Sequence, residues 1–159
     1  MPDISENFNS ATTDENLRAL VHVLKIKNFR GIFSRDNIPK TLKRGAYIVN
    51  YDTESGGGTH WISVVMSSPT RGFYYSSMGD KPLSAFCRKG LNIEYNDIQD
   101  QAFNSNLCGL FSVAFILMMQ EGMPAREFCS RMFKHQTEKG RLANNKLVIR
   151  ILNMGMHRR

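Results

Sequence analysis

The sequence has few of the residues that cross-link small proteins or bind metals in them. Its 159 residues include three cysteines, Cys87, Cys108 and Cys129, and none stands in the CxxC or Cys/His spacing of a zinc site. An odd number of thiols without such a spacing indicates a reducing compartment rather than a disulfide framework. We therefore expect free thiols and no metal.

Long apolar runs are also missing, and so is a secretion signal. No run approaches the roughly 18 apolar residues that a membrane span needs. The polar N-terminus has no signal-peptide pattern. We expect a protein that is neither secreted nor bound to a membrane, with one domain over residues 1–159 and a frayed segment over 1–12.

Acidic residues are few relative to basic ones. The chain has 14 Asp and Glu against 21 Lys and Arg, a formal net charge of +7. The C-terminal part carries a cluster of these cations: Arg126, Arg131, Lys134, Lys139, Arg141, Lys146, Arg150, Arg158 and Arg159. Two interpretations stay open, a solvated helical face and a non-specific surface for the phosphates of DNA.

The periodicity of the apolar residues predicts an α+β fold. Thr12 and Glu15 form a capping box before an amphipathic helix over residues 13–25, and Gly31 and Pro39 mark 29–44 as loop-rich. Alternating segments predict strands over 46–50, 61–66, 73–75 and 91–95, with a short helix over 83–88. The short connections favour an antiparallel central sheet.

A second apolar segment predicts the core helix. Residues 108–121 are apolar on all sides, as in a helix buried within a core, and Gly122 is a natural C-terminal stop. Further helices over 124–136 and 141–154 make the C-terminal third helical. The expected architecture is a sheet packed against a core helix that begins with Cys108.

Three residues form the inventory of a cysteine protease. Cys108 follows the capping residues Asn104 and Ser105, so it falls in the first helical turn, where free N–H groups and the helix dipole favour a thiolate. We expect a lowered thiol pKa for Cys108. His60, at the start of a strand, is the candidate base, and Gln101, seven residues before Cys108, is the candidate oxyanion donor.

Each of these residues also has an ordinary interpretation. Cys108 could be a small buried apolar residue, His60 a polar residue after a Gly-rich turn, and Gln101 a solvated loop residue. The other histidines, His22, His135 and His157, do not stand where strand and helix ends converge. The assignment depends on the combination.

The motifs together resemble adenain, the maturation protease of adenoviruses, in the clan of the deSUMOylating proteases. The resemblance covers Gly57 to Trp61 with His60, the segment Phe73 to Gly79, and Gln101 to Phe111 with Asn104-Ser105 and Cys108-Gly109. It runs from about residue 30 to 120, in the order of the family. Adenain-like proteases also occur in Polinton elements and virophages.

The sequence departs from the family pattern at one position. The family has Glu or Asp at the end of the 73–75 strand, hydrogen-bonded to the catalytic histidine, and Ser76 stands there instead. Three alternatives stay open: Ser76 orients His60, Asp80 serves as a displaced acid, or the chain is an inactive relative.

The resemblance implies an endopeptidase that cleaves viral capsid or core precursors during virion maturation. Cys108 would be the nucleophile, His60 the base, Gln101 the oxyanion donor and Ser76 the third position. It also implies a monomer in the virion and in the nucleus or viral factory of the infected cell. No cofactor is expected for the chemistry, while DNA or a viral peptide would act as an activator.

Two other functions compete with this one. A SUMO or ubiquitin-like isopeptidase of the same clan would use the same residues, although the seven-residue spacing from Gln101 to Cys108 is adenain-like. A catalytically weak, DNA-associated virion protein on the same scaffold is the non-enzymatic alternative, which Ser76 supports.

Overall fold

The chain folds into a five-stranded sheet with a helix packed along one face. The structure is a computed structural model, and it describes residues 4, 13–53, 55, 60–102, 105–133 and 137–158, without the Arg131 side chain. In chain order the elements are α1 (Asp14–Val23), β1 (Phe29–Ser34), β2 (Gly45–Asn50), β3 (Trp61–Met66), β4 (Arg71–Tyr75), the 3-10 turn η1 (Ser84–Phe86), β5 (Asn92–Tyr95), α2 (Cys108–Gln120), α3 (Ala125–Arg131) and α4 (Glu138–His157). The predicted α+β class is confirmed, and the C-terminal third is helical as expected, with α3 and α4.

The sheet is mixed, so the expectation of an antiparallel sheet is wrong at both edges. The order is β1-β2-β3-β4-β5; the central three strands pair antiparallel, but β1 is parallel to β2 and β5 is parallel to β4. Strand β1 lies where a loop was expected. Gly31 weakened its pattern: it has a φ of +134° at a shift in the β1–β2 register, and glycine inside a strand often marks such a bulge.

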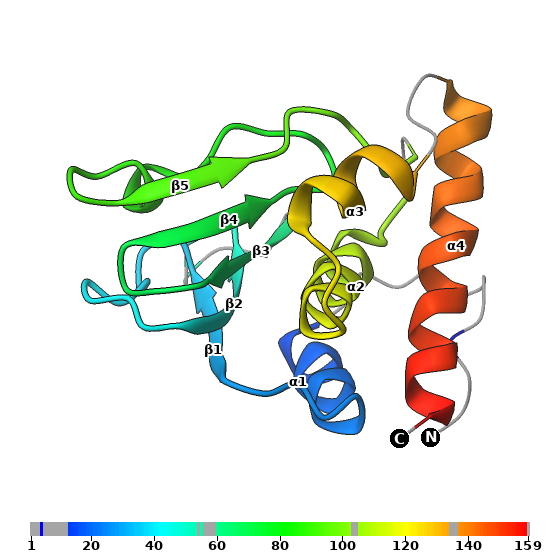
Figure 1. Ribbon diagram of the computed structural model, residues 1–159, viewed down its shortest axis with the longest axis horizontal. Helices are drawn as coiled ribbons and strands as arrows, with labels where there is room; N and C mark the ends of the chain where they lie inside the picture. The colour runs from blue at the N-terminus through cyan, green and yellow to red at the C-terminus, as the bar shows by residue number, and fades with distance from the viewer. Residues whose placement is uncertain are drawn as a thin grey trace.

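Helix α2 is the core helix that the sequence predicts. All residues from Gly109 to Leu117 are buried. The helix lies between the sheet, where it contacts β3, and α4 (Figure 1). Strand β2 is buried throughout, since Ile48 faces the α2 side of the sheet and Val49 faces a second apolar cluster on the other side. Helix α2 therefore packs on the central strand β3, and its first residue contacts the start of that strand.

The helix ends differ from the expected ones in detail. Thr13, not Thr12, caps α1, since its hydroxyl accepts from the Asn16 N–H at 3.1 Å. Helix α4 begins at Glu138 rather than 141, because Thr137 caps it in the same way. The short helix expected over 83–88 is only the single turn η1. Helix α2 begins after Leu107 without a side-chain cap.

One residue of the N-terminal segment is described. Ile4 is buried, and its N–H and C=O groups both bond the side chain of Asn153 on α4, each at 2.9 Å. At Ile4, therefore, the chain is docked rather than frayed; the rest of 1–12 lies outside the described residues. Within the described ranges, no helix combines the length and apolar character needed to cross a membrane.

Candidate active site

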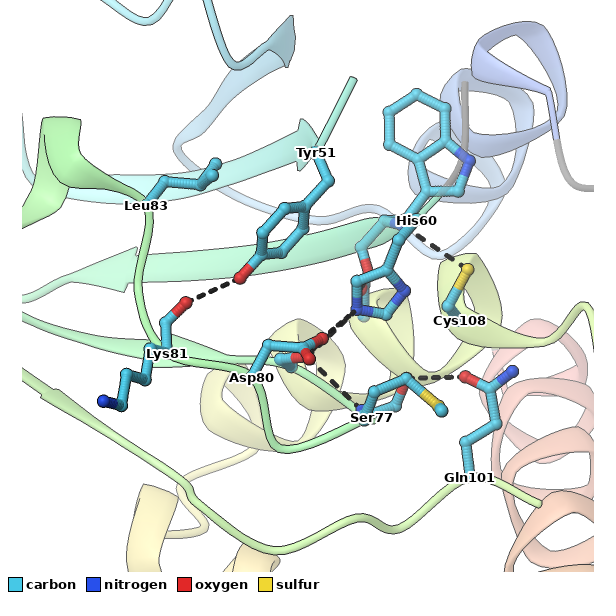
Figure 2. Close-up of polar contacts among 12 residues, drawn as sticks. Tyr51, His60, Ser77, Asp80, Lys81, Leu83, Gln101 and Cys108 are labelled. Carbon is cyan, nitrogen blue, oxygen red and sulfur yellow. Dashed lines mark hydrogen bonds and ion pairs between the residues drawn. The ribbon is translucent and has the colours of Figure 1, made fainter. Parts of the chain in front are cut away.

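His60 and Cys108 meet where the start of β3 contacts the start of α2. His60 directly precedes β3, and Cys108 is the first residue of α2. The N–H of Trp61 donates to the Cys108 Sγ at 3.4 Å, and the Ser112 hydroxyl, one helical turn on, donates to the Trp61 carbonyl at 3.3 Å. These two bonds join the first residue of β3 to α2. The thiol of Cys108 lies beside the ring of His60 (Figure 2).

The hydrogen bonds of His60 identify its basic nitrogen. Its Nε2 lies 3.0 Å from Ser76 Oγ, and that hydroxyl donates its single proton to Asp80 Oδ2 at 3.1 Å. Ser76 therefore accepts from Nε2, which must carry a hydrogen. The tautomer leaves Nδ1 as the acceptor, and Nδ1 is on the Cys108 side of the ring in Figure 2. This is the arrangement that a general base needs.

Ser76 and Asp80 share the position that an acid would occupy. Asp80 Oδ2 lies 3.2 Å from His60 Nε2, so the carboxylate reaches the ring directly as well as through Ser76. The turn that returns Asp80 to the ring is closed by the Gly79 N–H, which donates to the Ser76 carbonyl at 3.0 Å. Of the alternatives left open by the sequence, the structure brings together both orienting groups, Ser76 and Asp80.

The backbone of Ser76 is fixed by a residue that the sequence analysis missed. Buried Asn96 accepts from the Ser76 N–H at 3.0 Å and donates to the Ser76 carbonyl at 2.7 Å. These two bonds continue the pairing of β4 with β5 beyond the ends of both strands. Asn96 has no local motif, so its position in the fold is the only signal for this role.

Burial determines the electrostatics of the two reacting groups. Desolvation lowers the pKa of His60, and the Asp80 carboxylate acts in the opposite direction. Desolvation raises the pKa of the Cys108 thiol, against backbone hydrogen bonds from Trp61, Gly109 and Cys108 itself. The lowered thiol pKa expected from the helix position is therefore not found. Both directions favour a neutral thiol beside a neutral imidazole at neutral pH.

Gln101 is buried and oriented by contacts at both ends of its carboxamide. The Ser77 hydroxyl donates to its Oε1 at 2.6 Å (Figure 2), and its Nε2 donates to the Ser105 carbonyl at 2.7 Å and to the Ser105 hydroxyl at 2.8 Å. The N–H groups thus point to the segment that leads into Cys108. Both are occupied by Ser105, which orders this segment instead of capping α2. Asn104 lies outside the described residues.

The segment that carries Gln101 is held from two sides. The N–H groups of Asp100 and Gln101 both donate to the Ser77 carbonyl, at 2.8 and 3.0 Å. From α4, Asn144 donates to the Asp100 carbonyl at 2.9 Å, and Asn145 accepts from the Ala102 N–H at 3.2 Å. Both asparagines are buried polar residues in a helix, and their role becomes visible only when the burial is known.

The remaining candidate residues lie elsewhere. Burial, with a smaller contribution from the Asp100 charge, raises the pKa of Cys129 to about 12, while Cys87 is exposed beside η1. His22 is in α1 and His157 in α4, away from the site. His135 and the turn 56–59 lie outside the described residues. The described residues form no group of three or more side chains that could hold a metal ion.

Comparisons with known proteins give a structural match and no sequence match. No family model and no curated protein matches the chain. The crystal structure of ASFV pS273R protease is similar with a TM-score of 0.61 and 15% identity, over 96% of this chain and 70% of that one. The Se-Met form of that protease gives 0.56 and 14%, with the same coverage. The chain therefore has the fold of a viral protease, and membership of the adenain family is not confirmed.

Proposed function

We propose that the protein is a viral cysteine endopeptidase in which Cys108 is the nucleophile and His60 the base. The observation that carries this proposal is the placement of the His60 ring. Its Nε2 is held by Ser76 and Asp80 at 3.0 and 3.2 Å, and its Nδ1 faces the thiol at the start of α2. The fold, which resembles that of a viral protease, supports the same reaction class.

The first step forms the bond between the enzyme and its substrate. As Cys108 Sγ attacks the scissile carbonyl carbon, its proton moves to His60 Nδ1, and the carbonyl π electrons move to oxygen. The imidazolium keeps its Nε2–H bond to Ser76, and Asp80 stabilises its charge. Because thiol and imidazole are neutral at rest, the proton transfer accompanies the attack.

The following steps return the enzyme to its starting state. The oxyanion accepts from the Cys108 N–H and from one N–H of Gln101, which exchanges its bond to Ser105 for the substrate. When the C–N bond breaks, His60 gives its proton to the leaving amine. Water then attacks the thioester and loses a proton to His60, and the carboxylic acid and the Cys108 thiol are released.

We further propose viral capsid or core precursors as substrates, with DNA as an activating partner. The adenain-like motifs support these substrates and a site of action in the virion and the infected cell, for a protein that acts as a monomer. The support for DNA is the basic face of α4, formed by exposed Lys139, Lys146, Arg150 and His157. Their spacings of 7, 4 and 7 residues align them on one side of a helix.

The test of proteolysis needs no known substrate. We would incubate the protein, with and without duplex DNA, with a proteome-derived peptide library and identify new N-termini by mass spectrometry. We expect a small set of cleavage sites that share residues around the scissile bond, and none with Cys108→Ala. Identical peptide patterns for the two proteins would contradict the proposal, and cleavage confined to ubiquitin-like C-terminal tails would favour the isopeptidase.

The proposed base is tested by the alkylation of single thiols. Iodoacetamide modification at pH 7 is followed for each cysteine by mass spectrometry. We expect His60→Ala to slow the alkylation of Cys108 by about 10-fold or more, because the thiol loses its base. Cys87 is the internal control and should keep its rate. A Cys108 rate that does not depend on His60 would rule out the mechanism.

A further inference from the structure

Tyr51 contacts His60 through both its backbone and its ring. It directly follows β2, and its N–H donates to the His60 carbonyl at 2.8 Å. The centres of the two rings are 5.4 Å apart with an interplanar angle of 34° (Figure 2). The phenol therefore lies against the imidazole and restricts its rotation.

The hydroxyl of Tyr51 reaches the loop that carries Asp80. It donates to the carbonyl of Lys81, the next residue, at 2.6 Å (Figure 2). Since that proton is used, the side-chain hydrogen bond between Tyr51 and Tyr74 must be donated by Tyr74, whose oxygen accepts from the Leu83 N–H at 3.4 Å. The tyrosine pair, Tyr51 and Tyr74, thus holds the loop on both sides of Pro82.

These hydrogen bonds to the loop matter because the Asp80 side chain is 46% exposed, against 15% for that of His60. A half-exposed carboxylate has water as an alternative partner, and its attraction to a charged ring contributes little unless its backbone is fixed. Ser76 holds one Asp80 oxygen, and the turn at Gly79 directs the chain. The Tyr51 side chain adds a hydrogen bond to Lys81, and its ring also packs against His60. This side chain therefore links the Asp80 loop to the histidine ring.

We propose that Tyr51 is a positioning residue that holds His60 and Asp80 in one geometry, so that the displaced acid stays against Nε2. Tyr51 acts through His60 and Asp80 and takes no part in the proton transfer or the bond changes. The proposal rests on the proposed function. The ionisable or polar groups that face the His60 ring are Asp80 from the loop after β4, Ser76 at the end of β4, Cys108 of α2 and Tyr51 itself.

The test is the titration of His60 by NMR, with ¹³C-labelled histidine and the signal assigned from His60→Ala. Asp80→Asn should lower the His60 pKa, because the carboxylate favours the imidazolium. Tyr51→Phe keeps the ring and removes the hydroxyl, and it should lower the pKa by part of that amount. Tyr74→Phe, which breaks the next bond, should act in the same direction.

The double variant and a matched control distinguish positioning from a general loss of stability. Tyr51→Phe/Asp80→Asn should titrate like Asp80→Asn alone, because the hydroxyl acts only through the carboxylate. Tyr47→Phe, at the other end of β2, also removes a tyrosine hydroxyl that bonds the main chain, at Lys43, and should leave His60 unchanged. Full additivity of Tyr51→Phe and Asp80→Asn, or a wild-type titration for Tyr51→Phe, would overturn the proposal.

This readout is independent of catalysis. If Cys108 alkylation does not depend on His60 while Tyr51→Phe still shifts the titration, the proposed function fails and the positioning role stands. If alkylation depends on His60 but the titration ignores Tyr51, only the positioning role fails. Unfolding midpoints in urea for Tyr51→Phe and Tyr47→Phe confirm that both variants are folded.

Discussion

Asp100 is a carboxyl group buried next to Gln101. Its side chain accepts from the Tyr75 hydroxyl at 2.7 Å, and only 1% of the residue is exposed. Burial raises the pKa of Asp100 to about 7, although the Tyr75 hydrogen bond acts in the opposite direction. The side chain of Asp100, next to Gln101, is therefore protonated at mildly acidic pH and charged above neutrality.

This pKa makes stability depend on pH in an unusual direction for an aspartate. Between about pH 4 and pH 7 the folded state binds the proton and the unfolded state does not, so this contribution is full below pH 4 and is lost as pH rises through 7. We expect Asp100 to cost up to about 4 kcal/mol at pH 8 relative to pH 4. Asp100→Asn should remove that dependence, as measured by urea unfolding from pH 5 to 8.

Exposed Asp97, three residues earlier, provides the matched control. Asp97→Asn should leave the pH dependence of the unfolding free energy as in the wild type. Parallel pH dependences for the wild type and Asp100→Asn would show that this carboxyl does not carry the effect.

The residues identified from the sequence differ in kind from those that were missed. Cys108, His60 and Gln101 are marked by local features, a helix start, a strand start and a fixed spacing. Asn96, Tyr51 and Asn144 have no such motif, because each bonds a residue at least 20 positions away in the sequence that is adjacent only after folding. The prediction of a lowered pKa for the Cys108 thiol was wrong for a related reason. The position of Cys108 at a helix start is visible in the sequence, while the extent of its desolvation is not.

At the scale of elements, the turn after β4 decides where Asp80 lies. Gly79 has a φ of +72°, and a Cβ there would lie 2.9 Å from the carbonyl carbon of Ile98. Gly79→Ala should destabilise the fold by about 1–3 kcal/mol, from backbone strain and the contact, and move Asp80 from His60. The expected result is a lower unfolding midpoint together with slower alkylation of Cys108.

A glycine at the far end of α2 separates these two effects. Gly122 has a φ of +97°, and a Cβ there would meet nothing within 4 Å. Gly122→Ala should therefore cost only backbone strain and leave the Cys108 rate unchanged. Equal effects of the two substitutions on alkylation would mean that the turn does not position Asp80.

The edge strands show which parts of the sheet the sequence could predict. Strands β2 and β3 were found because alternating or β-branched residues fill them. Strand β1 was missed because Gly31 interrupts its pattern. The parallel pairing of β1 with β2, and of β5 with β4, was missed because short connections suggested a meander. Pairing direction depends on the path of the connection through space, which local periodicity does not encode.

At the scale of the whole molecule, the net charge of +7 would attract the phosphates of the proposed DNA partner. We expect affinity for a 20-base-pair duplex, measured by fluorescence anisotropy, to fall steeply with NaCl, because bound phosphates release counterions. Reversing the charge at Lys139, Lys146 and Arg150 should reduce the slope of log K against log[NaCl] by about 2 to 3.

A second triple variant tests whether position or total charge matters. Exposed Lys40, Lys43 and Arg44 precede β2, and changing them to Glu alters the net charge equally. This variant should keep most of the salt slope if the basic face of α4 is the binding surface. Equal losses in both variants would mean a response to net charge alone.

The asparagines of α4 also set an order of events during synthesis. Asn144 and Asn145 hold the segment that carries Gln101, yet they follow it by more than forty residues. A ribosome releases the chain from its N-terminus, so His60, Gln101 and Cys108 all emerge before the helix that holds the segment around Gln101. On the proposed function, a nascent chain that already contains its nucleophile would stay inactive toward neighbouring polypeptides until α4 has folded against it.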